Sequence, residues 1–167
     1  MAASLFDRVS EFLRSFDETG ARRDAPDDDT LRTARTALMV RVVDADGRIT
    51  SAEREALHRI VSETYGVGSP AAREIIDRGA DADREATDLY EHTAVIRRST
   101  DEGERVRLVE LLFELAYADE DLHETEDAAV KRISDLLGVD PRDRVLARRA
   151  VAERRGASVT PSSEPPG

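Results

Sequence analysis

Residues 38–53 read LMVRVVDADGRITSAE: an apolar stretch, an acidic turn at Asp46-Gly47, and a polar segment that leads to Glu53. Residues 111–126 read LLFELAYADEDLHETE and repeat this order. When the sequence is aligned with itself at an offset of 73 positions, Asp46 aligns with Asp119 and Glu53 aligns with Glu126. Apolar residues also align with apolar residues at this offset. Each stretch predicts a helix, an acidic loop and a second helix. Two such hairpins packed face to face would have pseudo-twofold symmetry.

The rest of the chain has helical spacing as well, and no segment alternates apolar and polar residues as a half-buried strand does. Aromatic residues make up 4% of the chain and Trp is absent, so the core must consist mainly of Leu, Ile, Val and Ala, which suits helix packing. The sequence therefore predicts an all-α fold, a compact bundle of about eight helices. Their expected ranges are about 1–16, 30–44, 51–65, 69–79, 81–98, 101–118, 122–137 and 141–155.

Four parts are expected along the chain: an amphipathic helix over 1–18, a linker over 19–29, the helical domain over 30–155 and a disordered tail over 156–167, rich in Ser and Pro. The amphipathic helix either docks on the main body or is an arm that grips a membrane or a protein partner. Its acidic residues disfavour the membrane. Its apolar residues share one helical face and include three of the four phenylalanines: Leu5, Phe6, Val9, Phe12, Leu13 and Phe16.

Charge and composition limit the classes of function. The chain has 25 Lys and Arg against 36 Asp and Glu, a formal net charge of −11, which disfavours nucleic acid and anionic membranes as partners. Cysteine is absent, which excludes disulfides, zinc fingers and cysteine nucleophiles. No signal peptide and no apolar run of about 20 residues is present, so we expect a cytoplasmic protein without membrane insertion. A protein partner is expected, and the sequence assigns no oligomeric state.

The acidic residues at matching positions have two interpretations, and the sequence leaves both open. In the first, they only cap helices, as Glu53 would do by accepting from the Thr50 backbone in a capping box. This fits the second half less well, because His123 is a poor N-cap and further carboxylates crowd around Glu126. In the second, crowded carboxylates repel one another unless a cation intervenes, and oxygen ligands suit calcium or magnesium. The candidate metal ligands are Asp46, Glu53, Asp119 and Glu126.

An EF-hand is disfavoured. Residues 42–53 nearly match the EF-hand calcium loop, with acidic residues, a glycine and a final glutamate at the required positions. The first ligand position, however, is Val42, which has no side-chain oxygen. The second half lacks two of the ligands and the turn glycine.

The two acidic stretches resemble the TerB family, an all-helical domain associated with tellurite resistance and also found at the N-terminus of some membrane-anchored DnaJ-type co-chaperones. The resemblance covers about residues 30–155. Two further segments are similar to a stand-alone bacterial subgroup of that family. The segments that carry the resemblance are 38–49 with Glu53, 111–119 with Leu122 and Glu126, and the additional 5–8 and 88–90.

The resemblance implies a compact helical bundle whose acidic clusters are proposed to hold a metal, here through the four candidate ligands. It also implies an association with stress and tellurite-resistance systems at the inner face of the membrane. Glu120 departs from the family pattern, which has a glycine after the second aspartate. The family has no established reaction, so membership by itself assigns none.

Enzymatic function is not expected, because the chain has no glycine-rich phosphate loop, no Ser-His-Asp order and no serine elbow. A hydrolase with paired carboxylates is the enzymatic alternative. The favoured hypothesis is a non-enzymatic module with acidic loops that bind a divalent cation, and the other is a protein–protein adaptor without metal. Arginines of the last helix are expected to pair with the chain's own acids or with an acidic partner: Arg142, Arg144, Arg148, Arg149, Arg154 and Arg155.

Overall fold

The computed structural model describes residues 26–120 and 122–158. These residues form seven α-helices and no strand, which confirms the all-α prediction. The predicted helix over 1–18, most of the linker and residues 159–167 of the predicted tail lie outside the described residues. The helices are α2 (Asp28–Val43), α3 (Ser51–Tyr65), α4 (Ser69–Glu85), α5 (Tyr90–Ser99), α6 (Glu102–Ala116), α7 (Glu124–Leu137) and α8 (Pro141–Ser158).

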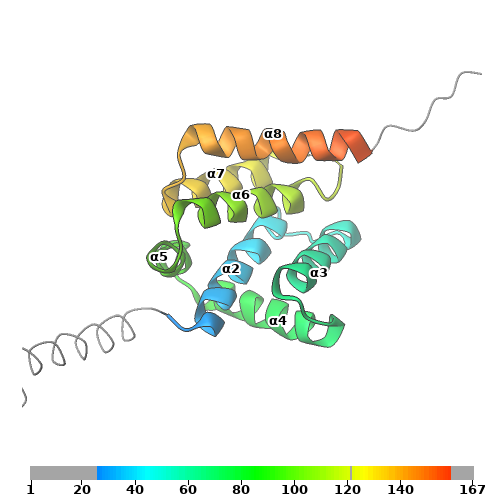
Figure 1. Cartoon of the computed structure of the whole chain (residues 1–167). Helices are drawn as coiled ribbons and strands as arrows, with labels where there is room; N and C mark the ends of the chain where they lie inside the picture. The colour runs from blue at the N-terminus through cyan, green and yellow to red at the C-terminus, as the bar shows by residue number, and fades with distance from the viewer. Residues whose placement is uncertain (1–25, 121, 159–167) are drawn as a thin grey trace, which may run out of the picture.

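Helix α2 is the centre of the arrangement. It packs most extensively on α4 and also contacts α3, α5, α6 and α7, while α8 packs mainly on α6 (Figure 1). Eight of its residues are buried, and they lie on several sides of the helix, as expected for a helix that others enclose. The core that surrounds it draws on both halves of the chain and includes Leu38, Ile60, Ile96, Leu112, Phe113 and Ile133.

Local capping explains most helix ends. Helix α2 begins two residues earlier than the sequence predicts, because Asp27 is its N-cap and accepts a 2.7 Å hydrogen bond from the Thr30 amide. Gly66 and Gly138 end α3 and α7 in the left-handed conformation, with φ of 61° and 70°. The predicted ends of these two helices, at about residues 65 and 137, are therefore confirmed.

The predicted helix end at Gly79 is wrong, because α4 continues to Glu85 and the chain breaks only before α5. Gly79 lies against α2: a Cβ there would be 2.6 Å from Cγ2 of Thr36 and 3.0 Å from its backbone carbonyl carbon. The glycine thus marks the close approach of α2 and α4. It does not terminate the helix.

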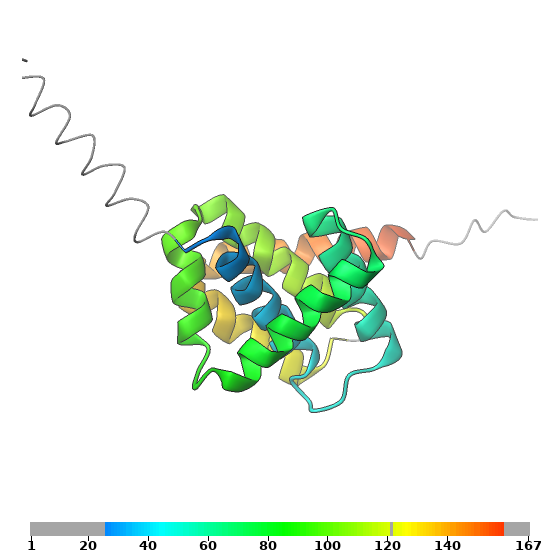
Figure 2. The same ribbon diagram turned by 90° about the horizontal axis from the view of Figure 1, so that it is seen from below.

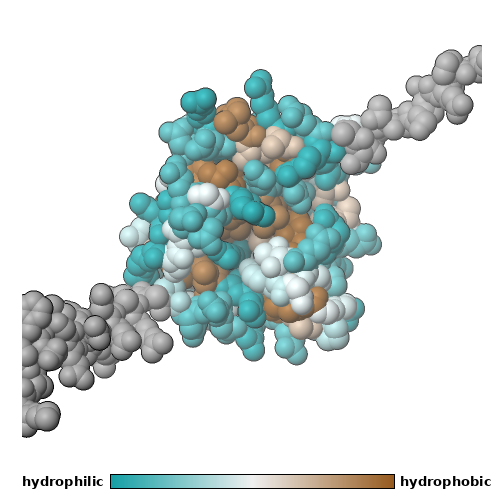
Figure 3. Space-filling model, in the orientation of Figure 1, coloured by the Kyte–Doolittle hydropathy of each residue, from teal (hydrophilic) through white to brown (hydrophobic). Residues whose placement is uncertain are grey.

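The face of the molecule in Figure 3 is mainly hydrophilic, with scattered apolar patches. Within the described ranges, none of the helices combines the length and the apolar composition needed to cross a bilayer.

Candidate functional site: two joined acidic loops

The loops after α2 and α6 have the same backbone hydrogen bonds. The Asp44 amide donates to Val40 at 2.9 Å, and the Tyr117 amide, 73 positions later, donates to Phe113 at 2.9 Å. The amides of Gly47 and Glu120 then donate to the carbonyl oxygens three residues earlier, at 2.9 and 3.0 Å. Equivalent backbone hydrogen bonds therefore close the two turns.

Glu120 adopts the conformation of the glycine that it replaces. Its φ is 71°, beside 76° for Gly47, and it is the non-glycine residue with positive φ among those described. A side chain in this region costs about 1–2 kcal/mol. The departure from the family pattern at Glu120 therefore leaves the turn intact and introduces local strain.

A hydrogen bond joins the two loops directly. The Thr50 hydroxyl donates to Oδ1 of Asp119 at 2.7 Å, and the loops lie side by side in cyan and yellow in Figure 2. Asp46 makes a local contact instead, because its Oδ1 accepts from the Arg48 amide at 2.9 Å. Both aspartates therefore fix loop conformation.

Glu53 and Glu126 lie in the first turns of α3 and α7, and each is only 1% exposed. Oε2 of Glu53 accepts from the Thr50 amide at 2.8 Å, and the Glu53 amide donates to the Thr50 hydroxyl at 3.2 Å, so the predicted capping box is present. In α7, Oε2 of Glu126 accepts from the His123 amide at 3.4 Å, which is longer than the 2.8 Å bond that Glu53 accepts in α3. The second cap is therefore weaker, as the sequence predicts.

Capping accounts for one oxygen of Glu126 and leaves the other without a partner. Its Oε1 is buried and has no hydrogen-bond partner in the described part of the chain. Burial, the adjoining carboxyl of Glu53 and the charge of Asp46 together raise the pKa of Glu126 to about 8, against the lowering effect of the His123 amide. Near neutral pH, the carboxyl of Glu126 therefore holds a proton next to Glu53.

The four residues selected from the sequence are only partly brought together. Glu53 and Glu126 adjoin each other, Asp46 acts on Glu126 through its charge, and Asp119 is tied to Thr50. In residues 26–120 and 122–158, no three Asp, Glu or His side chains converge as ligands around one ion would. The sequence missed the bridging role of Thr50, although its position as N-cap beside an acidic turn was visible.

Val42 stands at the first ligand position of an EF-hand, has no side-chain oxygen and is fully buried in the last turn of α2. The apolar helix thus extends through the position where such a loop would already coordinate calcium.

Arginines of α8 pair with acids of the neighbouring helices, one of the two outcomes expected from the sequence. Arg148 lies 3.5 Å from Asp127, and Arg154 lies 3.4 Å from both Glu110 and Glu114. These pairs are partly exposed and each contributes little stability. They nevertheless neutralise part of the α8 surface.

Comparison with protein-family models gives a match over residues 32–149 to the family described as Tellurite resistance protein TerB. Comparisons with curated proteins and with solved structures give no match. The matched range takes up more than half of the chain and contains both acidic loops, most of α2, all of α3 to α7 and the first half of α8. On this match, and on the all-helical fold that agrees with it, the chain belongs to the TerB family.

Proposed function

We propose that this chain is a non-enzymatic, cytoplasmic module of bacterial stress and tellurite-resistance physiology whose two acidic loops together bind a divalent cation, calcium or magnesium. Family membership supports the physiological part of the proposal. The observation that carries the cation is the buried Oε1 of Glu126, a carboxylate oxygen without a partner that adjoins a second buried carboxyl, that of Glu53.

A cation would replace the proton that the two glutamates otherwise need. Two buried carboxylates repel each other when both are charged without a positive partner, and hard cations prefer such oxygen ligands. Asp46 and Asp119 would complete the ligand set by turning away from the Arg48 amide and the Thr50 hydroxyl. Matching backbone bonds in the two loops support a duplicated hairpin with pseudo-twofold symmetry, in which each half supplies one aspartate and one glutamate.

Calorimetric titration of the metal-free protein with calcium, magnesium, manganese and zinc tests the proposal. We expect heat and a raised melting temperature with calcium or magnesium, and loss of both in Glu126→Gln and in Glu53→Gln. Glu104→Gln is the matched control, because Glu104 is also a capping-box glutamate but is exposed on α6. Absence of heat and of any melting shift at millimolar metal would exclude the cation site.

A metal-free protein–protein adaptor is the second candidate, and the capping bonds favour it. Oε2 of both glutamates accepts an N-cap amide, a role that needs no ion. The partner would be a protein, with the inner face of the membrane as the place of contact. In this case the double variant Asp119→Asn with Glu126→Gln would still bind its protein partner in a pulldown. The melting temperatures of the wild type and of this variant would both be independent of metal.

A further inference from the structure

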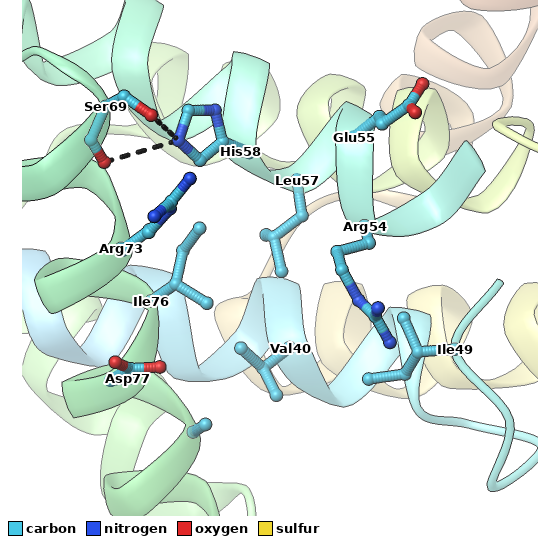
Figure 4. A pocket seen from close by; sticks show the side chains of 11 residues that line it. Val40, Ile49, Arg54, Glu55, Leu57, His58, Ser69, Arg73, Ile76 and Asp77 are labelled. Atoms are coloured by element: carbon cyan, nitrogen blue, oxygen red, sulfur yellow. Dashed lines mark hydrogen bonds between the residues drawn. The ribbon is translucent and has the colours of Figure 1, made fainter. Parts of the chain in front are cut away.

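A groove of ≈ 570 Å³ lies between α3 and α4, over the C-terminal part of α2 (Figure 4). Its floor is apolar, formed by Val40, Leu57 and Ile76, with Ile49 at one end. Ile49 is 37% exposed and is one of the few large apolar side chains at the described surface. A hydrogen bond of 3.1 Å between His58 Nε2 and Ser69 Oγ lies at the opposite end.

Charges of both signs surround this floor. Arg54 and Glu55 come from α3, and Arg73 and Asp77 come from α4. Within the described residues, none of these four side chains forms an ion pair with another part of the chain. The rim therefore has two cations and two anions available for an occupant that is apolar on one face and mixed in charge on the other.

The chain itself contains a segment of this chemistry. Residues 1–16 have six apolar side chains at helical spacing, and the opposite face has two acids and two arginines, Asp7, Arg8, Glu11 and Arg14. As a helix this segment would be about 24 Å long. The other end of the chain cannot serve, because residues 159–167 include a single aliphatic side chain, Val159.

The segment can reach the groove. Asp29, in the first turn of α2, forms a 3.2 Å ion pair with Arg78 of α4, so the chain enters the fold beside the groove wall that Asp77 and Ala80 line. Residues 17–25 can span about 30 Å when extended. This reach exceeds the roughly 20 Å from the start of α2 to Val40 near its end.

We propose that residues 1–16 dock as an amphipathic helix into the groove between α3 and α4 of the same molecule, with their phenylalanine face on Val40, Leu57 and Ile76. The segment is then a built-in cover for this apolar surface. The acidic and basic side chains along the edge of the docked helix pair with the acidic and basic side chains on the rim of the groove.

Paramagnetic broadening in the full-length chain tests this docking. The chain has no cysteine, so Ser10→Cys gives a unique attachment point for a nitroxide beside the apolar stripe. We expect loss of amide signal intensity over residues 54–58 and 73–80 and unchanged intensity along α8. Reduction of the nitroxide must restore the signals. Adding Phe12→Ser should restore them as well, and this second change leaves the residues of the folded domain untouched.

Two results would overturn the proposal. One is broadening that is absent or falls on another surface of the molecule. The other is broadening that persists when the spin-labelled chain is mixed with isotope-labelled chain that carries no nitroxide, because the occupant would then be a second copy.

Discussion

The hydroxyl of Thr50 connects the two acidic loops by donating a 2.7 Å hydrogen bond to the Asp119 carboxylate. The same oxygen accepts from the Glu53 amide at 3.2 Å and so caps α3. One side chain therefore holds the start of α3 and the loop after α6 in register, at the place where the two buried glutamates meet.

Replacing Thr50 by Val should lower the free energy of unfolding by about 1–2 kcal/mol, because both the cap and the bond to Asp119 are lost. Thr50→Ser keeps the hydroxyl and should restore most of this loss. Urea unfolding of the two variants measures the difference. Equal stability of Val and Ser variants would mean that the bond between the loops contributes nothing.

Stability should fall as the pH rises from about 5 to about 9. The folded protein holds the Glu126 proton with a pKa of about 8, against 4.5 for the ordinary side chain. A raised folded-state pKa gives stability that is complete below the unfolded value and is lost as the pH passes the folded value. One pKa unit corresponds to about 1.4 kcal/mol, so we expect a loss of at least about 2 kcal/mol in this window.

Glu126→Gln isolates this contribution, because the amide keeps an acceptor and has no charge. Its unfolding free energy should be nearly independent of pH between about 5 and 9 where that of the wild type falls, and the variant should be the more stable protein at pH 9. Glu104→Gln, at an exposed cap, should keep the slope of the wild type. A wild-type slope in Glu126→Gln would assign the effect to another group.

Glu120→Gly should raise the free energy of unfolding by about 0.5–1 kcal/mol, because glycine accepts the φ of 71° without strain. Glu120→Ala removes the charge but keeps the strain, so it should gain less. Gly47→Ala, at the matching turn, should be destabilising. Chemical denaturation compares the three, and a gain in Glu120→Ala equal to that of the glycine variant would show that charge, and not backbone strain, is relieved.

Gly79→Ala should destabilise the protein by about 1–3 kcal/mol, because the new methyl group would lie 2.6 Å from Thr36 Cγ2 and close to its backbone. Gly103→Ala is the matched control on α6, where the nearest atom to a Cβ is 3.4 Å away. This control should be neutral or stabilising by up to about 1 kcal/mol. Thermal melting of both variants checks the close approach of α2 and α4.

The sequence predicts the helical class and the acidic loops because both depend on local patterns. The apolar spacing of residues 38–43 and the Asp46-Gly47 turn require no knowledge of distant contacts. Gly79 shows the limit of this approach, since a glycine needed for close packing looks the same in a sequence as one that ends a helix. Only the position of Thr36 distinguishes the two cases.

The candidate site was predictable in composition but not in geometry. Glu53 and Glu126 stand out as matching acids, yet their adjacency depends on how the first turns of α3 and α7 are placed by the whole core. The bond from Thr50 to Asp119 spans 69 positions, and no local pattern indicates it.

Carbon NMR of the Glu126 carboxyl, followed through a pH titration of the metal-free protein and again with calcium, tests whether this buried carboxyl holds a proton that a cation replaces. We expect a midpoint near pH 8 without metal, because the carboxyl is buried beside Glu53, and a clearly lower midpoint with calcium, because the ion displaces the proton. A midpoint near the ordinary 4.5 that calcium does not move would show that Glu126 neither holds this proton nor binds the ion.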